Sequence, residues 1–211
     1  MDYLKPTELI DYNSIEIQGI TARFKTEKLS DKQMAIALYL KVRDGWRYNP
    51  YKLCFEAECY KASNIAKKDD GHCIEKSILL TACLRALNIP ARIHLAKVKN
   101  HIGVERLIEK FGTNELTPHG MVDLFIDGKW LKVSPAFNIE LCERYNIAPL
   151  DFDGENDSVF HEFDNAGNVF MEYLEDYGHF EDVPVEFIFE NFKTNYPSIY
   201  QQFKGHKKIR L

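Results

Sequence analysis

A run of helical apolar positions between Cys73 and Leu87 constrains the fold of this 211-residue chain more than any other feature. Apolar residues recur there at spacings of three and four, and further leucines widen the stripe beyond one face. The stripe comprises Ile74, Ile78, Leu79, Ala82, Cys83 and Ala86, flanked by Leu80, Leu84 and Leu87. A helix that is apolar around most of its circumference must be covered on several sides. We therefore expect a central helix that starts near Cys73 and is stopped by Asn88 and Pro90.

Other segments predict the elements that surround this helix. Ser30 and Gln33 form a capping box before an apolar pattern that ends at Gly45, so a helix is expected there. Residues 54–68 are expected to form another short helix. Residues 103–111 are expected to form a further one, closed by the glycine that follows.

The clearest hairpin signal joins residues 119–126 to residues 129–133. The turn between them is Asp127-Gly128, and Asp-Gly between apolar runs favours a two-residue type I′ loop. Residues 91–98 alternate well enough to form a strand as well. The sequence therefore predicts an antiparallel sheet beside the central helix.

The predicted register of this hairpin places polar residues around His119. Extending the pairing beyond residue 133 makes Ser134 and Asn138 the two diagonal neighbours of His119, with backbones about 6–8 Å apart. Asp123 lies four residues along the strand, about 13 Å away, and is too distant to orient the imidazole. We expect Asp123 to pair with Lys132 instead.

Cys73 is the residue best placed for nucleophilic chemistry. The unpaired N–H groups at a helix start stabilise a thiolate and can hold an oxyanion. Gly71 permits a sharp turn and leaves room for a substrate, whereas Asp69 and Asp70 would raise the thiol pKa if unpaired. The structural alternatives are a small buried thiol at Cys73 and a strand-end polar residue at His119.

Two stretches of the chain resemble one known family. Residues 71–92 read GHCIEK at one end and LRALNIPAR at the other, and they are similar to the nucleophile helix of the transglutaminase-like superfamily. Residues 119–130, HGMVDLFIDGKW, resemble the histidine hairpin of that superfamily. Residues 39–48 resemble the helix that precedes the site. The similarity covers about residues 30–138, and the motifs are specific in combination.

The resemblance implies a papain-like core in which Cys73 is the nucleophile and His119 is its base. The family usually places an aspartate before a proline at the end of the second hairpin strand. Here that position is Ser134, which can accept a hydrogen bond from the ring but carries no charge. Asn138 is a candidate substitute for the orienting residue. Met121 replaces the aromatic residue that the family has two positions after the histidine.

Three further residues are assigned to the cleft or the oxyanion site: Tyr48, Trp46 and His72. Tyr48 offers a polar donor beside the oxyanion, and the alternative for Tyr48 and Trp46 is a place in the core or on the rim. The resulting fold expectation is α+β, with the nucleophile helix packed on an antiparallel sheet. One domain spans residues 1–211, with a transglutaminase-like core at 30–138 and an acidic, aromatic-rich, loop-rich layer at 139–211.

The expected activity is a cysteine hydrolase, a peptidase or amidase, that acts on a peptide, protein or small amide without a cofactor. Hydrolysis is favoured over cross-linking because nothing indicates a second amine site or calcium control. One alternative is acyl transfer of the arylamine N-acetyltransferase type, which uses the same thiol and imidazole. The other is a non-catalytic module that binds peptides or proteins on the same scaffold.

Charge excludes some partners. The net charge is −5, and residues 151–190 hold 13 acidic residues and no lysine or arginine. Because nucleic-acid binding needs a basic face, no nucleic acid is expected. The basic tail at 207–210 is interpreted as a solvated terminus. Acidic residues at 151–162, Glu162 included, only loosely echo a calcium loop, and a solvated turn is the better interpretation.

The number of cysteines and the length of the apolar stretches indicate the cellular compartment in which the protein is expected. No apolar run reaches about 18 residues, so no membrane span is expected. No secretory signal precedes residue 30, and the five cysteines are expected to be free thiols in a reducing, cytoplasmic compartment. Cys54 and Cys59 have loose zinc spacing without a second pair, so no metal site is expected.

Overall fold

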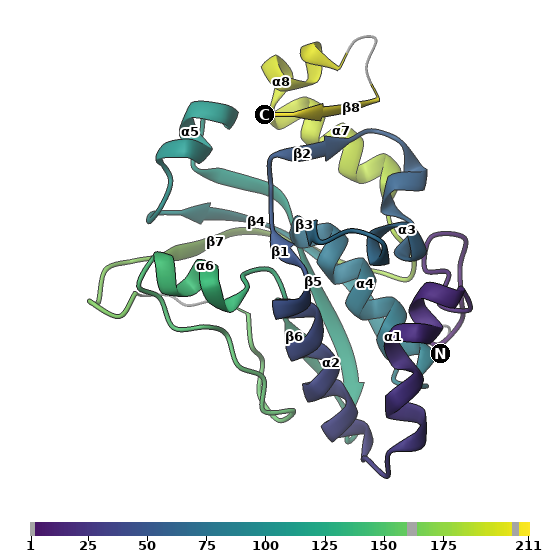
Figure 1. Cartoon of the computed structure of the whole chain (residues 1–211). Coiled ribbons are helices and arrows are strands. Elements are labelled where there is room, and N and C mark those ends of the chain that lie inside the picture. The colour runs from purple at the N-terminus through teal and green to yellow at the C-terminus, as the bar shows by residue number, and fades with distance from the viewer. Residues whose placement is uncertain (1–2, 160–163, 204–206) are drawn as a thin grey trace.

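The computed structural model describes residues 3–159, 164–203 and 207–211, and it has the expected mixed α+β architecture (Figure 1). Within these residues the helices are α1 (Ile15–Thr26), α2 (Asp31–Gly45), η1 (Ala57–Tyr60), α3 (Ala62–Ala66), α4 (Cys73–Ala86), α5 (Glu105–Phe111), α6 (Ile139–Arg144), α7 (Val185–Asn195) and α8 (Pro197–Gln202). The strands are β1 (Arg47–Tyr48), β2 (Lys52–Cys54), β3 (Asp70–Gly71), β4 (Ala91–Asn100), β5 (Glu115–Ile126), β6 (Lys129–Val133), β7 (Met171–Phe180) and β8 (Lys208–Arg210).

The predicted central helix is confirmed as α4. Every residue of α4 from Cys73 to Arg85 is buried, since α1, α2 and α3 pack on it from one side and β5 from the other. Figure 1 shows these helices gathered against one face of the sheet. The leucines that widen the apolar stripe therefore have partners all around the helix.

The helices that flank α4 match the sequence in part. The capping box of Ser30 and Gln33 is present, and α2 ends at Gly45 as predicted. α5 ends at Gly112, which adopts φ 74° in the left-handed region. The single helix predicted over 54–68 is wrong, because that stretch forms the end of β2, the turn η1 and the short helix α3.

The antiparallel sheet has the strand order β6-β5-β4-β7, and its predicted hairpin is confirmed. Asp127 and Gly128 have φ values of 51° and 84°, as a type I′ turn requires. The ladder ends at the pair Val122–Val133, so the predicted extension beside His119 is wrong. The Ser134 N–H instead donates to the Ser158 carbonyl at 2.8 Å, and the proline that follows has no N–H to offer.

The predicted ion pair between Asp123 and Lys132 is also wrong, although the two residues lie opposite each other in the ladder. Asp123 accepts from Arg92 Nε at 2.9 Å and lies 3.1 Å from His94 Nδ1. Lys132 pairs with Asp176 at 3.4 Å. β4 supplies Arg92 and His94 on the same sheet face, and these two partners contact Asp123 in place of Lys132.

The C-terminal third contributes regular structure to the core. β7 pairs with β4 and forms an edge of the main sheet, where a loop-rich layer was expected. The basic tail forms β8, which pairs antiparallel with β2. The expected solvated terminus is therefore a paired strand, and Figure 1 shows it with α7 and α8 beside β2. Residues 160–163 of the acidic segment, which include Phe160, Glu162 and Phe163, lie outside the described residues.

The expectation of five free thiols is wrong for two cysteines. Cys54 and Cys59 form a disulfide, so neither sulfur is available to a metal. The other three, Cys73, Cys83 and Cys142, are free and buried. Within the described part of the chain, no helix is both long enough and apolar enough to cross a membrane.

Candidate active site

Local structure places Cys73 at the first position of α4. His72 precedes the helix in an extended conformation, and its N–H donates to the Glu75 carboxylate at 3.0 Å. β1 pairs in parallel with β3, which aligns Tyr48 with Gly71, two residues before the cysteine. Cys73 is 5% exposed. The sequence therefore positions the thiol as predicted, at the start of a buried helix.

Strand β5 touches the start of α4 at Gly120. A Cβ at Gly120 would lie 2.6 Å from the Ile74 Cα and 2.8 Å from the Ile74 nitrogen, so only glycine fits. The backbone N–H groups of Gly120, Ile74 and Cys73 favour the thiolate of Cys73 and so act to lower its pKa. Since His119 immediately precedes Gly120, the fold brings the backbone of the predicted base to the start of the nucleophile helix.

Burial sets the protonation of both groups. Burial raises the pKa of Cys73 to about 11, and the three N–H groups oppose this shift without overcoming it. Burial also lowers the pKa of His119 to about 4. At neutral pH both groups are therefore uncharged, so the thiolate expected from the helix start is not the resting form.

The two predicted catalytic residues line different small cavities. Cys73 lines one of about 60 Å³ with Tyr48, His72 and Tyr196. His119 lines another of about 10 Å³ together with Ser134.

A larger groove of about 590 Å³ adjoins both small cavities. It shares Tyr48, Pro50 and Leu116 with the Cys73 cavity. It shares Phe137 and Phe170 with the His119 cavity. The groove therefore borders both small cavities, although neither Cys73 nor His119 lines the groove itself.

The residues assigned to the cleft divide into two groups. Tyr48 and His72 line the Cys73 cavity, and burial lowers the pKa of His72. The Tyr48 hydroxyl is buried, has no hydrogen-bond partner among the described residues, and has its pKa raised by burial and by the proximity of Cys73. Trp46 is 8% exposed, belongs to the main hydrophobic core and does not line the cavity.

The two candidates for orienting His119 have different surroundings. Ser134 shares the cavity of His119, and its carbonyl accepts from the Tyr39 hydroxyl at 3.0 Å. Asn138 binds elsewhere: its Oδ1 accepts from the Tyr48 N–H at 2.9 Å, and its Nδ2 donates to Glu140. Asn138 therefore fixes the backbone of Tyr48.

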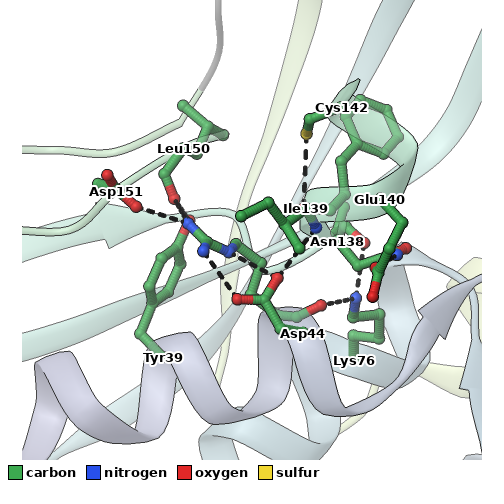
Figure 2. A network of polar contacts seen from close by, with 12 residues as sticks. Tyr39, Asp44, Lys76, Asn138, Ile139, Glu140, Cys142, Leu150 and Asp151 are labelled. Carbon is green, nitrogen blue, oxygen red and sulfur yellow. Dashed lines mark hydrogen bonds and ion pairs between the residues drawn. The ribbon is translucent and has the colours of Figure 1, made fainter. Parts of the chain in front are cut away.

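Lys76 is an important residue that the sequence analysis missed. Its side chain is fully buried, and Nζ donates to the carbonyls of Arg43 and Ala136, each at 2.7 Å (Figure 2). Burial lowers the pKa of Lys76 to about 7. This contact ties α4 to the end of α2 and to the loop after Ser134. A lysine inside an otherwise apolar helix, three residues after Cys73, was the available signal.

The C-terminal helices also contribute to the site. The Tyr196 hydroxyl accepts from the Thr117 N–H and donates to the Glu115 carbonyl, each at 2.8 Å. Ile188 and Phe192 of α7 line the Cys73 cavity with it. No sequence motif marks these residues, since they meet β5 only after the chain has folded.

Similarity to a known family covers the core of the chain. The family model of the transglutaminase-like superfamily matches residues 18–135, which is more than half of the chain. Among solved structures, a "Putative Cysteine Protease from Cytophaga hutchinsonii" is similar, with 16% sequence identity and a TM-score of 0.48. The match covers 64% of this chain and 40% of that one. No curated protein matches the chain. The chain is a member of the transglutaminase-like superfamily.

Proposed function

We propose that the protein is a cysteine hydrolase that cleaves an amide or peptide bond, with Cys73 as nucleophile and His119 as general base. One observation carries the proposal: Gly120, the strand residue next to His119, packs directly on the start of α4, where an added Cβ would lie 2.6 Å from the Ile74 Cα. The large groove borders the cavities of both residues.

The uncharged resting state defines the first step. As the Cys73 sulfur bonds to the substrate carbonyl carbon, the thiol proton passes to His119, and the carbonyl oxygen becomes an oxyanion. The Cys73 N–H and the Tyr48 hydroxyl are the candidate donors to that oxyanion. Collapse breaks the C–N bond, and His119 protonates the leaving amine. Water then attacks the thioester with His119 again as base, which releases the acid and restores the thiol.

Ser134 is the proposed orienting residue, because its side chain shares the His119 cavity whereas Asn138 is engaged with Tyr48 and Glu140. A hydroxyl fits an imidazole that is neutral at rest. It would stabilise an imidazolium less than a carboxylate does, which favours a modest rate.

A second candidate function is supported by a specific observation. Burial that raises the pKa of Cys73 to about 11 and lowers that of His119 to about 4 suits a non-catalytic module that binds peptides in the groove. The two functions differ in how Cys73 reacts, because only a working pair transfers the thiol proton to His119 during attack.

Alkylation of Cys73 by iodoacetamide separates the two functions. If Cys73 and His119 work as a catalytic pair, the alkylation rate changes little from about pH 6 to about pH 9, because neutral His119 removes the thiol proton. An unassisted thiol reacts only as thiolate, so its rate rises about tenfold per pH unit over that range. Labelling is located by peptide mass spectrometry, and Cys73→Ala is subtracted as the background of the other two free thiols.

His119→Gln is the decisive variant. In this variant the alkylation rate of Cys73 should rise steeply with pH, whereas in the wild type it should change little. Circular dichroism checks that the variant has the native fold. A steep profile in the wild type, unchanged in His119→Gln, would eliminate the hydrolase proposal and leave the binding module.

A further inference from the structure

The large groove that borders the Cys73 and His119 cavities has an unusual charge for this protein. Five lysine or arginine side chains and two aspartates line it, although the whole chain has a net charge of −5. The cations come from separated parts of the sequence. They are Arg47, Lys52, Arg106, Arg144 and Arg210.

These five cations differ in whether they form ion pairs with the described carboxylates. Arg47 pairs with Asp69 at 2.9 Å, and Lys52 pairs with Asp70. For Arg106, Arg144 and Arg210, no carboxylate among the described residues lies within ion-pair distance, and all three are exposed. They converge from α5, α6 and β8, so tertiary structure alone gathers them.

The floor of the groove is apolar and aromatic. Tyr51 lies beneath Arg106, whose guanidinium is 4.3 Å from the ring centroid. Tyr145, Phe137 and Leu116 continue this surface toward the Cys73 cavity. A ligand that matches the groove therefore combines negative charges with apolar or aromatic side chains.

The acidic segment of the chain itself does not neutralise the groove in the described residues. Asp151 pairs with Arg43, Asp176 pairs with Lys132, and Glu155 pairs with Lys32. None of these three acids lines the groove. The positive charge of the groove therefore faces solvent and is available to a separate molecule.

We infer that the groove selects acidic peptides, whose carboxylates bind Arg106, Arg144 and Arg210 while the backbone leads to Cys73. The choice of a peptide rests on the proposed function, since the groove borders the cavity of a thiol that would attack an amide. The charge preference rests only on the lining residues. A peptide can present carboxylates together with apolar side chains, which matches a groove that has both cations and aromatic residues. A polyphosphate chain presents negative charge alone, so the groove favours the peptide.

Fluorescence anisotropy tests the inference without turnover. The probe is a fluorescein-labelled, glutamate-rich peptide, and its partner has glutamine at every glutamate. Both are titrated with Cys73→Ala protein. The glutamate peptide should bind at least about tenfold more tightly at low salt, and the difference should shrink at high salt. Equal affinity for the two peptides at low salt would overturn the inference.

Matched variants locate the charges. Arg106→Gln/Arg144→Gln should weaken binding of the glutamate peptide by about tenfold and leave binding of the glutamine peptide unchanged. Lys25→Gln/Lys28→Gln removes the same charge from exposed positions outside the groove and should change neither affinity. Equal losses in both double variants would show a general charge effect and refute the groove assignment.

A competitor distinguishes the class of ligand. An unlabelled oligothymidylate that displaces the probe at lower concentration than the unlabelled glutamate peptide would refute the peptide assignment. Failure of the proposed function is distinguishable, because a steep alkylation profile at Cys73 leaves these affinities untouched.

Discussion

Acid should destabilise the folded protein through His119. Burial lowers the pKa of this imidazole from 6.5 to about 4, so between these values the unfolded chain binds a proton that the native protein does not. Stability therefore rises with pH across this window and falls as the pH drops through 6.5. At about pH 5 the native imidazole is still neutral while the unfolded one is protonated, which costs about 2 kcal/mol relative to about pH 7.

Urea denaturation at the two pH values measures this cost. The wild type should lose about 2 kcal/mol more free energy of unfolding than His119→Gln, which has no titrating group at this position. His179→Gln is the matched control, because that side chain is exposed, and it should behave like the wild type. The comparison cancels the acid sensitivity of the carboxylates, which all three proteins share.

Identical losses for the wild type and His119→Gln would refute the argument. They would mean that the native imidazole takes up a proton as readily as the unfolded one, and so is not held neutral by burial. The neutral resting state from which the catalytic proposal starts would then be withdrawn as well.

Three further substitutions test contacts at the site. Gly120→Ala should destabilise the protein by about 1–3 kcal/mol or more in urea denaturation, because its methyl group would overlap the Ile74 backbone. Gly45→Ala, where a Cβ meets nothing within 4 Å, should be neutral or slightly stabilising, and equal effects would contradict the packing argument. Lys76→Met should cost about 1–3 kcal/mol by leaving two buried carbonyls without a donor, and an unchanged denaturation midpoint would show that these bonds contribute nothing. Tyr196→Phe should accelerate hydrogen exchange at the amide it accepts from by about tenfold, and unchanged protection there would show that the hydroxyl is dispensable.

Local signals in the sequence predicted their own elements well. The capping box of Ser30, the Asp127-Gly128 turn and the glycine after residue 111 each act within a few residues, so the structure confirms them. Predictions that depended on distant partners failed more often. The pairing of Asp123 and the strand at the C-terminus depend on partners that are distant in the sequence. The disulfide between Cys54 and Cys59 depends on the oxidation of two thiols, which no local pattern encodes.

The candidate site shows the same division. The position of Cys73 at a helix start and the strand that carries His119 follow from local patterns, and the family resemblance pairs the two residues. The surroundings of Ser134 and Asn138 could not follow, because β6 ends at residue 133 where a bridge to Ser158 takes over. Tyr196 and Lys76 act through backbone groups far away in the sequence, and backbone groups leave no signature in residue identity.

The sequence by itself determined a central apolar helix with a cysteine at its start, and a histidine-bearing strand that continues into the Asp127-Gly128 hairpin. Helix caps, turn preferences and apolar periodicity are local, so they survive without knowledge of the fold. Tertiary structure alone decided that both groups are buried and uncharged, and that three arginines without an ion pair among the described residues line the groove beside their cavities. The protonation state of a group and the electrostatic potential around it depend on which atoms replace water there. In this protein those atoms belong to α5, α6, α7 and β8.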